Sequence, residues 1–286
     1  MKPQKICDTP IYSAVVFDDD NIFAVYTTPQ GTGGDIYGYT GTPLSWVKVG
    51  GPGKKFVWGD SWLYGLSPDN KSVFRWTKMG QTWNKIGEYV DIYGGAGGLL
   101  GIESQSGDVY LYSQGTKSWT KIGGPGKMFT VGTHMGEFKP AYVYGLSPDS
   151  KSVWQWTGIG TTWNQIGGPA SAIYAGGDKL YATNPDSGDI YQYDQATKKW
   201  TKIGGPGKIF AVDSYYGDIC GLSVDGSAIF HYKGQPMQWE KIGDAASNIW
   251  MGWGYMPMPQ NKGGPSRFVL AQEPQTKALL LYEWQV

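Results

Sequence analysis

Pairs of aromatic residues recur along the chain with a single variable residue between them, and a Trp follows at a fixed distance. In one copy, Trp154 and Trp156 flank Gln155, and Trp163 comes after a gap of six residues. An aromatic face packs well against the apolar C–H face of a sugar ring, and nearby polar groups can hold its hydroxyls. This combination of residue types is therefore suited to carbohydrate recognition.

Four copies of the motif carry a polar variable residue, so they supply the candidate carbohydrate-binding residues. Each copy contributes that residue, the second aromatic and the following Trp. The alternative interpretation is that the polar residues are partly exposed strand positions and that the inner aromatics fill a core. The candidates are Arg75, Trp76, Trp83, Gln155, Trp156, Trp163, Gln192, Tyr193, Trp200, His231, Tyr232 and Trp239.

Catalytic and metal-binding patterns are weak in this sequence. The two His residues, His134 and His231, lie in no nucleophile or metal motif, and the GxSxG, P-loop and HExxH patterns are absent. Asp18–Asp20 and Asp186–Asp189 could ligate Ca²⁺, but neither has the EF-hand spacing, and ordinary turns explain both. We predict no catalytic residue, no metal site and no cofactor.

Composition restricts the class of protein further. Among 286 residues there are 44 Gly, 14 Trp and 20 Tyr, only 17% are charged, and 24 basic residues balance 24 acidic ones. Disordered chains lack aromatics, and nucleic-acid binders carry a basic stripe, so neither class fits. No apolar run approaches the roughly 18 residues of a membrane span, and no signal peptide is recognisable. We expect two free thiols, no membrane insertion, and a protein that is cytoplasmic or released without a signal peptide.

Repeats cover the whole chain and determine the predicted fold. WTKIGGPGKMF at 119–129 is nearly identical to WTKIGGPGKIF at 200–210, and YGLSPDNKSVFRW at 64–76 returns as YGLSPDSKSVWQW at 144–156. Each unit of about 40 residues reads as four short strands separated by Gly, Pro and Asp turns. Units of this kind, repeated radially, are typical of a β-propeller. We predict an all-β, seven-bladed β-propeller with four-stranded antiparallel blades.

The chain is expected to form one domain whose last blade is closed by the N-terminus. Tyr282 belongs to a seventh aromatic motif that lacks its Trp, whereas Lys5-Ile6-Cys7 resembles the Lys-Ile-Gly that follows the Trp elsewhere. The N-terminal strand should thus complete the last blade and leave no open sheet edge. The predicted blades are 8–49, 50–86, 87–122, 123–166, 167–203, 204–242, and 243–286 together with 1–7.

The repeated Trp-x-Lys-Ile-Gly, Tyr-Gly-Leu and Ile-Tyr-x-Tyr segments resemble the tectonin repeat over residues 5–282. Tectonin-type β-propeller lectins occur in fungal fruiting bodies, slime moulds, horseshoe crab and fish eggs. The resemblance implies glycan binding at several equivalent sites between blades, often in innate defence against microbes or feeding animals. The chain departs from familiar tectonins, which often have six blades, and its second, fourth and sixth units resemble one another most.

Connectivity divides the loops between two faces of the propeller. The Gly-Gly-Pro-Gly and Ser-Pro-Asp loops share one face, where turn chemistry explains their similarity. The opposite face carries the insertions around His134–Pro140 and Trp253–Pro265, and in repeat proteins insertions often mark the binding face. The sequence thus predicts a multivalent lectin for glycans or glycoconjugates on cell surfaces. A protein-interaction scaffold without sugar affinity and, less favoured, a propeller hydrolase are the alternatives; the sugar, the binding face and the oligomeric state are left open.

Overall fold

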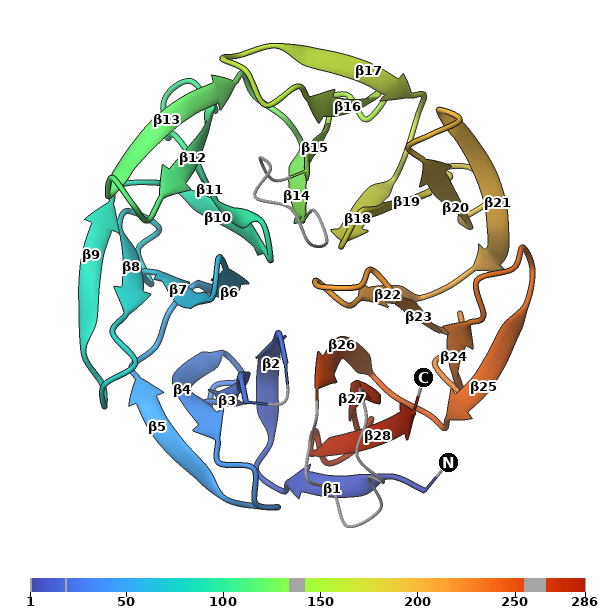
Figure 1. Ribbon diagram of the computed structural model, residues 1–286. Helices are drawn as coiled ribbons and strands as arrows, with labels where there is room; N and C mark the ends of the chain where they lie inside the picture. Colours follow the sequence, from blue (N-terminus) through green and yellow to red (C-terminus); the bar gives the residue numbers. More distant parts are fainter. Residues whose placement is uncertain (1, 19, 134–141, 255–265, 286) are drawn as a thin grey trace.

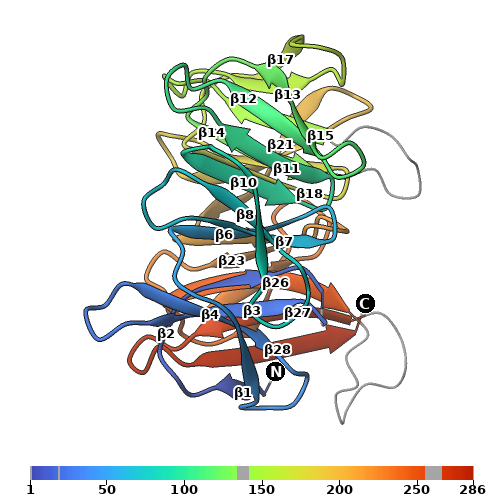
Figure 2. The same cartoon turned by 90° about the vertical axis from the view of Figure 1, so that its left-hand side faces the viewer.

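The structure is a computed structural model that describes residues 2–18, 20–133, 142–254 and 266–285. Seven four-stranded antiparallel sheets stand as blades around a common axis, which confirms the predicted seven-bladed β-propeller (Figure 1). Each blade runs from an inner strand near the axis to an outer strand at the rim, and the side view shows the blades stacked around the ring (Figure 2). Strands adjacent in sequence are adjacent in each blade.

The blades are numbered here in chain order. Blade 1 comprises β2 (Ile11–Val16), β3 (Ile22–Thr27), β4 (Gly33–Tyr39) and β5 (Trp46–Gly50); blade 2, β6 (Lys55–Gly59), β7 (Trp62–Leu66), β8 (Val73–Trp76) and β9 (Trp83–Gly87); blade 3, β10 (Asp91–Gly95), β11 (Gly98–Ile102), β12 (Val109–Ser113) and β13 (Ser118–Gly123); blade 4, β14 (Met128–Gly132), β15 (Tyr142–Leu146), β16 (Val153–Trp156) and β17 (Trp163–Gly167); blade 5, β18 (Ala172–Gly176), β19 (Lys179–Thr183), β20 (Asp189–Asp194) and β21 (Lys199–Pro206); blade 6, β22 (Ile209–Val212), β23 (Ile219–Leu222), β24 (Ile229–Tyr232) and β25 (Trp239–Gly243); and blade 7, β26 (Asn248–Gly254), β27 (Ser266–Gln272), β28 (Leu279–Gln285) and β1 (Gln4–Cys7).

Blade 7 joins the two ends of the chain. Strand β1 pairs antiparallel with β28, with Gln4 opposite Leu281 and Cys7 opposite Leu279. The N- and C-termini accordingly lie at the same blade in Figure 1. The predicted closure by the N-terminal strand is confirmed, and it covers the outer edge of β28.

The hydrophobic core lies between neighbouring blades. Between blades 4 and 5, for example, Tyr144 and Leu146 of one blade pack against Ile173 and Leu180 of the next, and all four side chains are buried. Glycines that end the inner strands allow the blades to approach closely: a Cβ on Gly95 would lie only 2.0 Å from the Val131 carbonyl oxygen. The alternation of strand faces thus gives each blade two buried faces.

In blades 1 to 6, the Trp at the start of the outer strand, which we call the anchor Trp, connects its blade to the preceding one. The Trp163 indole Nε1 donates a hydrogen bond to the Ile122 carbonyl of blade 3 at 2.6 Å. A Cβ on Gly123 would lie 2.6 Å from the same nitrogen, so the Gly of the Lys-Ile-Gly motif makes room for the next blade's indole. The bond recurs for Trp46, Trp83, Trp119, Trp200 and Trp239 with Ile6, Val49, Ile86, Ile166 and Ile203.

The anticipated insertions are largely outside the described residues. Residues 134–141 and 255–265 lie outside the described residues, whereas Trp253 and Gly254 lie in β26. Within the described part of the chain, no helix is long and apolar enough to cross a bilayer.

Candidate functional site: aromatic grooves between blades

A groove opens where the Gly-Pro-Gly loop that enters a blade lies beside that blade's anchor Trp. In blade 4 it is about 190 Å³ in volume and is lined by Phe129, Trp154 and Trp163, with the backbone of 124–126 on one side and 145–148 on the other. The walls are mainly apolar and aromatic. Such a groove can hold a small apolar or ring-shaped group against the indole of Trp163.

The same groove is found in three other blades. Its volume is about 290 Å³ in blade 2, 220 Å³ in blade 5 and 190 Å³ in blade 6. The equivalent aromatic lining residues are Phe56, Phe74 and Trp83 in blade 2, Tyr191 and Trp200 in blade 5, and Phe210, Phe230 and Trp239 in blade 6.

Local turn chemistry positions one wall of the groove. In the Ser-Pro-Asp turn of blade 4, Ser147 Oγ donates to Asp149 Oδ1 at 2.7 Å and accepts from the Ser152 amide at 3.0 Å. The hydroxyl–carboxylate bond lowers the pKa of Asp149 and keeps it ionised at neutral pH. Ser150 takes a positive φ of 62°, and its hydroxyl bonds Lys127 Nζ at 2.8 Å. These contacts fix the turn, leaving aromatic faces as the main surface offered to a ligand.

The structure separates the predicted site residues into distinct places. The anchor residues Trp83, Trp163, Trp200 and Trp239 each line a groove, on the face that carries the Gly-Pro-Gly loops. The face expected to bind from the sequence, which carries the insertions, is the opposite one. The outer strands lie along the rim in Figure 1, so the start of each reaches the end of the preceding one.

The second aromatics do not line these grooves. Trp76 and Trp156 donate from Nε1 to the carbonyls of Gly80 and Gly160, both at 2.9 Å, and so brace the loops that precede the anchor Trp. Tyr193 and Tyr232 are 2% and 8% exposed, which makes them core residues. Tyr193 cannot present a ring face to a ligand without rearrangement.

The variable residues lie on the strand face that contacts the next blade. Arg75 donates to Gln114 Oε1 of blade 3, and its guanidinium lies 4.3 Å from the Trp62 ring centroid. Gln155 and Gln192 lie opposite Tyr144 and Tyr181 in the sheets.

Both ring nitrogens of the fourth variable residue, His231, are buried. Its ring centroid is 4.9 Å from that of Trp284, and neither ring nitrogen has a hydrogen-bond partner among the described residues. Burial lowers the pKa of His231, so the ring is neutral at pH 7.

A further pocket opens on the face that carries the insertions, which is the binding face expected from the sequence. It lies between blades 1 and 2, has a volume of about 360 Å³, and is lined by Phe23, Tyr39, Lys48, Trp76 and Lys78 among others. Of the predicted site residues, only Trp76 is part of it.

Sequence reasoning missed the first aromatic of each pair and the Gly-Pro-Gly backbone. Phe74, Trp154, Tyr191 and Phe230 face the grooves, whereas the predicted set contained their partners two residues later. The available signal was the near identity of the Gly-Gly-Pro-Gly loops, which turn chemistry alone explained equally well.

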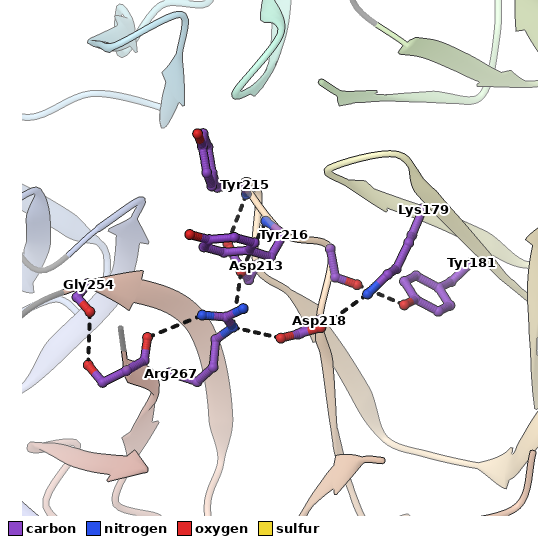
Figure 3. Close-up of polar contacts among 10 residues, drawn as sticks. Lys179, Tyr181, Asp213, Tyr215, Tyr216, Asp218, Gly254 and Arg267 are labelled. Carbon is purple, nitrogen blue, oxygen red and sulfur yellow. Dashed lines mark hydrogen bonds and ion pairs between the residues drawn. The ribbon is translucent and has the colours of Figure 1, made fainter. Parts of the chain in front are cut away.

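A buried ionic cluster joins blades 5, 6 and 7 (Figure 3). Arg267 Nε lies 2.6 Å from Asp218 Oδ2 and 3.7 Å from Asp213 Oδ2, and Lys179 Nζ lies 3.1 Å from Asp218 Oδ1. Tyr216 places its ring 4.0 Å from the Arg267 guanidinium, and its amide donates to Asp213. Because the charged groups neutralise one another, the cluster is suited to holding blades together.

The electrostatic environments of its two carboxylates differ. Burial raises the pKa of Asp213 to about 6, against the opposing effects of the Tyr215 amide and Arg267. Asp218 is also buried, but Lys179 and Arg267 outweigh that effect and lower its pKa. No group of three or more His, Cys, Asp or Glu in the described residues is arranged to hold a metal ion.

The chain folds as a seven-bladed β-propeller, and solved structures of similar fold are known. Similar solved structures include a GH74 enzyme of Niastella koreensis (TM-score 0.64, 15% identity, 97% of this chain and 43% of that one). YCF48 bound to D1 peptide is another, with a TM-score of 0.59 and 13% identity over 100% of this chain and 96% of that one. The ectodomain of the receptor kinase CR4 of Physcomitrella patens is a third, with a TM-score of 0.54 and 14% identity over 91% of this chain and 73% of that one. The chain spans less than half of the GH74 protein.

At these identities the likeness establishes the fold alone. No known family matches the sequence, and no curated protein does.

Proposed function

We propose that the protein is a multivalent lectin that binds glycans in the grooves between its blades. The observation that carries this proposal is the recurrence of one groove in blades 2, 4, 5 and 6, each with an anchor Trp in the same position. A single catalytic centre would not require four similar sites, whereas a multivalent binder gains from every copy. The resemblance to tectonin repeats supports the same function.

Repetition would compensate for weak individual sites. A shallow aromatic groove gives a sugar one stacking surface and few hydrogen bonds, so we expect a Kd near the millimolar range for each. Several sites that engage a clustered surface at once raise the apparent affinity by roughly 10²–10⁴. The proposed partners are glycans or glycoconjugates on cell surfaces, in defence against microbes or feeding animals, and no enzymatic activity belongs to the proposal.

A glycan array tests the proposal directly. We expect signal from a restricted set of sugars that increases with printing density, because density allows several grooves to bind together. The matched comparison is folded Trp163→Ala protein, which should give a weaker signal because one of the four grooves loses its aromatic platform. A folded wild-type protein that gives no signal across a broad array would overturn the proposal.

A second candidate function is a peptide-binding scaffold. One structure similar to this chain over nearly the full length of both proteins is YCF48 bound to D1 peptide. A blank array together with saturable binding to a peptide library would favour this alternative.

A further inference from the structure

The residue that enters each blade just before its inner strand occupies equivalent positions in blades 3, 4 and 5. The next residue's amide donates to the second strand in all three: Val90 to Ile102, Lys127 to Leu146 and Ser171 to Thr183, each at 2.9 Å. The entry residue itself is therefore Tyr89 in blade 3, Gly126 in blade 4 and Ala170 in blade 5. Comparing these positions shows what each groove contains.

In blade 4 the side chain beside the anchor Trp comes from the inner strand. Phe129 lies opposite Gly145 in the sheet, and a Cβ on that glycine would be 2.9 Å from the Phe129 ring. The centroids of Phe129 and Trp163 are 6.1 Å apart. Blades 2 and 6 repeat this arrangement, with corresponding distances of 5.9 and 6.2 Å. Glycine at the entry position leaves the groove open.

Blade 3 has an additional aromatic ring. Its inner-strand position is already filled by Ile92, which lies opposite Gly101. Tyr89 then places its ring against the anchor Trp119 at 4.2 Å between centroids, and 5.7 Å from Tyr110. Tyr110 corresponds to Trp154 of blade 4. Tyr89 is only 9% exposed, so its ring fills the space between the two aromatics that line the groove elsewhere.

Blade 5 is the natural comparison, because it shares the aliphatic inner-strand residue with blade 3. Ile173 lies opposite Ala182, and the entry residue is Ala170 rather than Tyr. Without the phenol ring, a groove of about 220 Å³ remains between Tyr191 and Trp200. The difference between an occupied and an open groove therefore depends chiefly on one side chain.

We propose that Tyr89 is a built-in occupant of the third groove and that its ring shows how a ligand lies in the open ones. On this basis the ligand of groove 5 is a six-membered ring that packs against Trp200 at an inclined angle, because the Tyr89 ring is tilted by 41° to the Trp119 indole. A pyranose has that shape. This inference deepens the proposed function and rests on it for the identity of the ring as a sugar.

Polar groups at groove 5 are placed to hold the substituents of such a ring. Asn184 Oδ1 accepts from the amides of Asp186 and Ser187, both at 2.9 Å, which fixes the orientation of the side-chain amide at the groove wall. Tyr191 also lines this groove. A ring with hydroxyls at its edge would meet donors there and an aromatic face beneath.

The test removes the entry-residue ring from blade 3, adds one to blade 5, and uses p-cresol, the tyrosine side chain as a free molecule, as the probe. Tyr89→Gly should open the third groove and add one p-cresol site, seen over Trp119 in a crystal soaked with the probe. Ala170→Tyr should close groove 5 and remove one site. The double variant should return the number of bound p-cresol molecules to the wild-type value.

Folding is checked by circular dichroism and thermal melting for each variant. Folded Tyr89→Gly protein without p-cresol over Trp119 would overturn the proposal, as would folded Ala170→Tyr protein that still binds p-cresol beside Trp200. If one variant does not fold, the other decides. A sugar identified on the array should show the same gain and loss of one site. Correct p-cresol counts with no sugar binding would refute the lectin function but retain the ring position.

Discussion

Trp163 has two roles that a substitution can separate. Its indole lines the groove of blade 4 and also donates to the Ile122 carbonyl. Trp163→Phe should retain binding in the groove while losing about 1–3 kcal/mol of unfolding free energy, because a buried carbonyl loses its partner. Trp163→Ala should cost about 3–5 kcal/mol and reduce the stoichiometry of a monovalent sugar by one. Urea unfolding and calorimetry measure the two effects, and unchanged stoichiometry in folded Trp163→Ala would exclude Trp163 as a platform.

Asp213 should make stability depend on pH in the mildly acidic range. Its pKa is about 6 in the folded protein and 3.8 as the ordinary value, so the folded state binds more protons between these limits. Stability from this group is therefore full below about pH 4 and is lost as the pH rises through 6, by roughly 3 kcal/mol at about 1.4 kcal/mol per pKa unit. Asp213→Asn should flatten this part of the curve. Thermal melts from pH 4 to 7 provide the measurement, and an unchanged slope would contradict the assignment.

At the scale of strands, the outer strand and its anchor Trp form the seam between blades. Gly123→Ala would place a Cβ 2.6 Å from Trp163 Nε1, so the indole must move and its hydrogen bond must weaken. We expect a loss of about 1–3 kcal/mol. Gly124→Ala is the control, since its Cβ would meet nothing closer than Asp108 at 4.0 Å, and it should change stability by less than about 0.5 kcal/mol. Equal denaturation midpoints for the two variants would contradict the stabilising role of the contact between Gly123 and Trp163.

At the same scale, the sequence allowed the strand pairing within a blade to be predicted, but not the contacts that the anchor Trp residues make. The fixed spacing of Trp156 and Trp163 predicted a hairpin, because turn length is a local property. Which residues meet across the blade interface was not predictable in the same way. Trp163 of blade 4 donates to Ile122 of blade 3, and within blade 3 the entry residue Tyr89 packs on Trp119 because of one substitution in a loop. Repeat alignment alone does not reveal either contact.

For the whole molecule, closure by β1 is the feature with the largest expected effect. Ile6 and Cys7 are buried, and the Ile6 carbonyl accepts the Trp46 indole bond, so β1 stabilises both blade 7 and its contact with blade 1. Deleting residues 1–7 should lower the melting temperature and promote association through the exposed edge of β28. Deleting only residues 1–3 leaves β1 intact and serves as the control. Identical melting and size-exclusion profiles for both truncations would show that closure contributes little.

The alternation of blade types has a geometric consequence in a ring with an odd number of blades. Blades 2, 4 and 6 share the Phe-containing groove, with anchors at Trp83, Trp163 and Trp239. Around seven blades these three positions are separated by two, two and three blades, so they cannot obey threefold symmetry. With the groove of blade 5 added, a flat array of identical receptors would therefore meet four unevenly spaced contacts, with a wide gap across blades 7 and 1 where the chain closes. The propeller would consequently bind such a surface in one preferred rotational orientation about its axis.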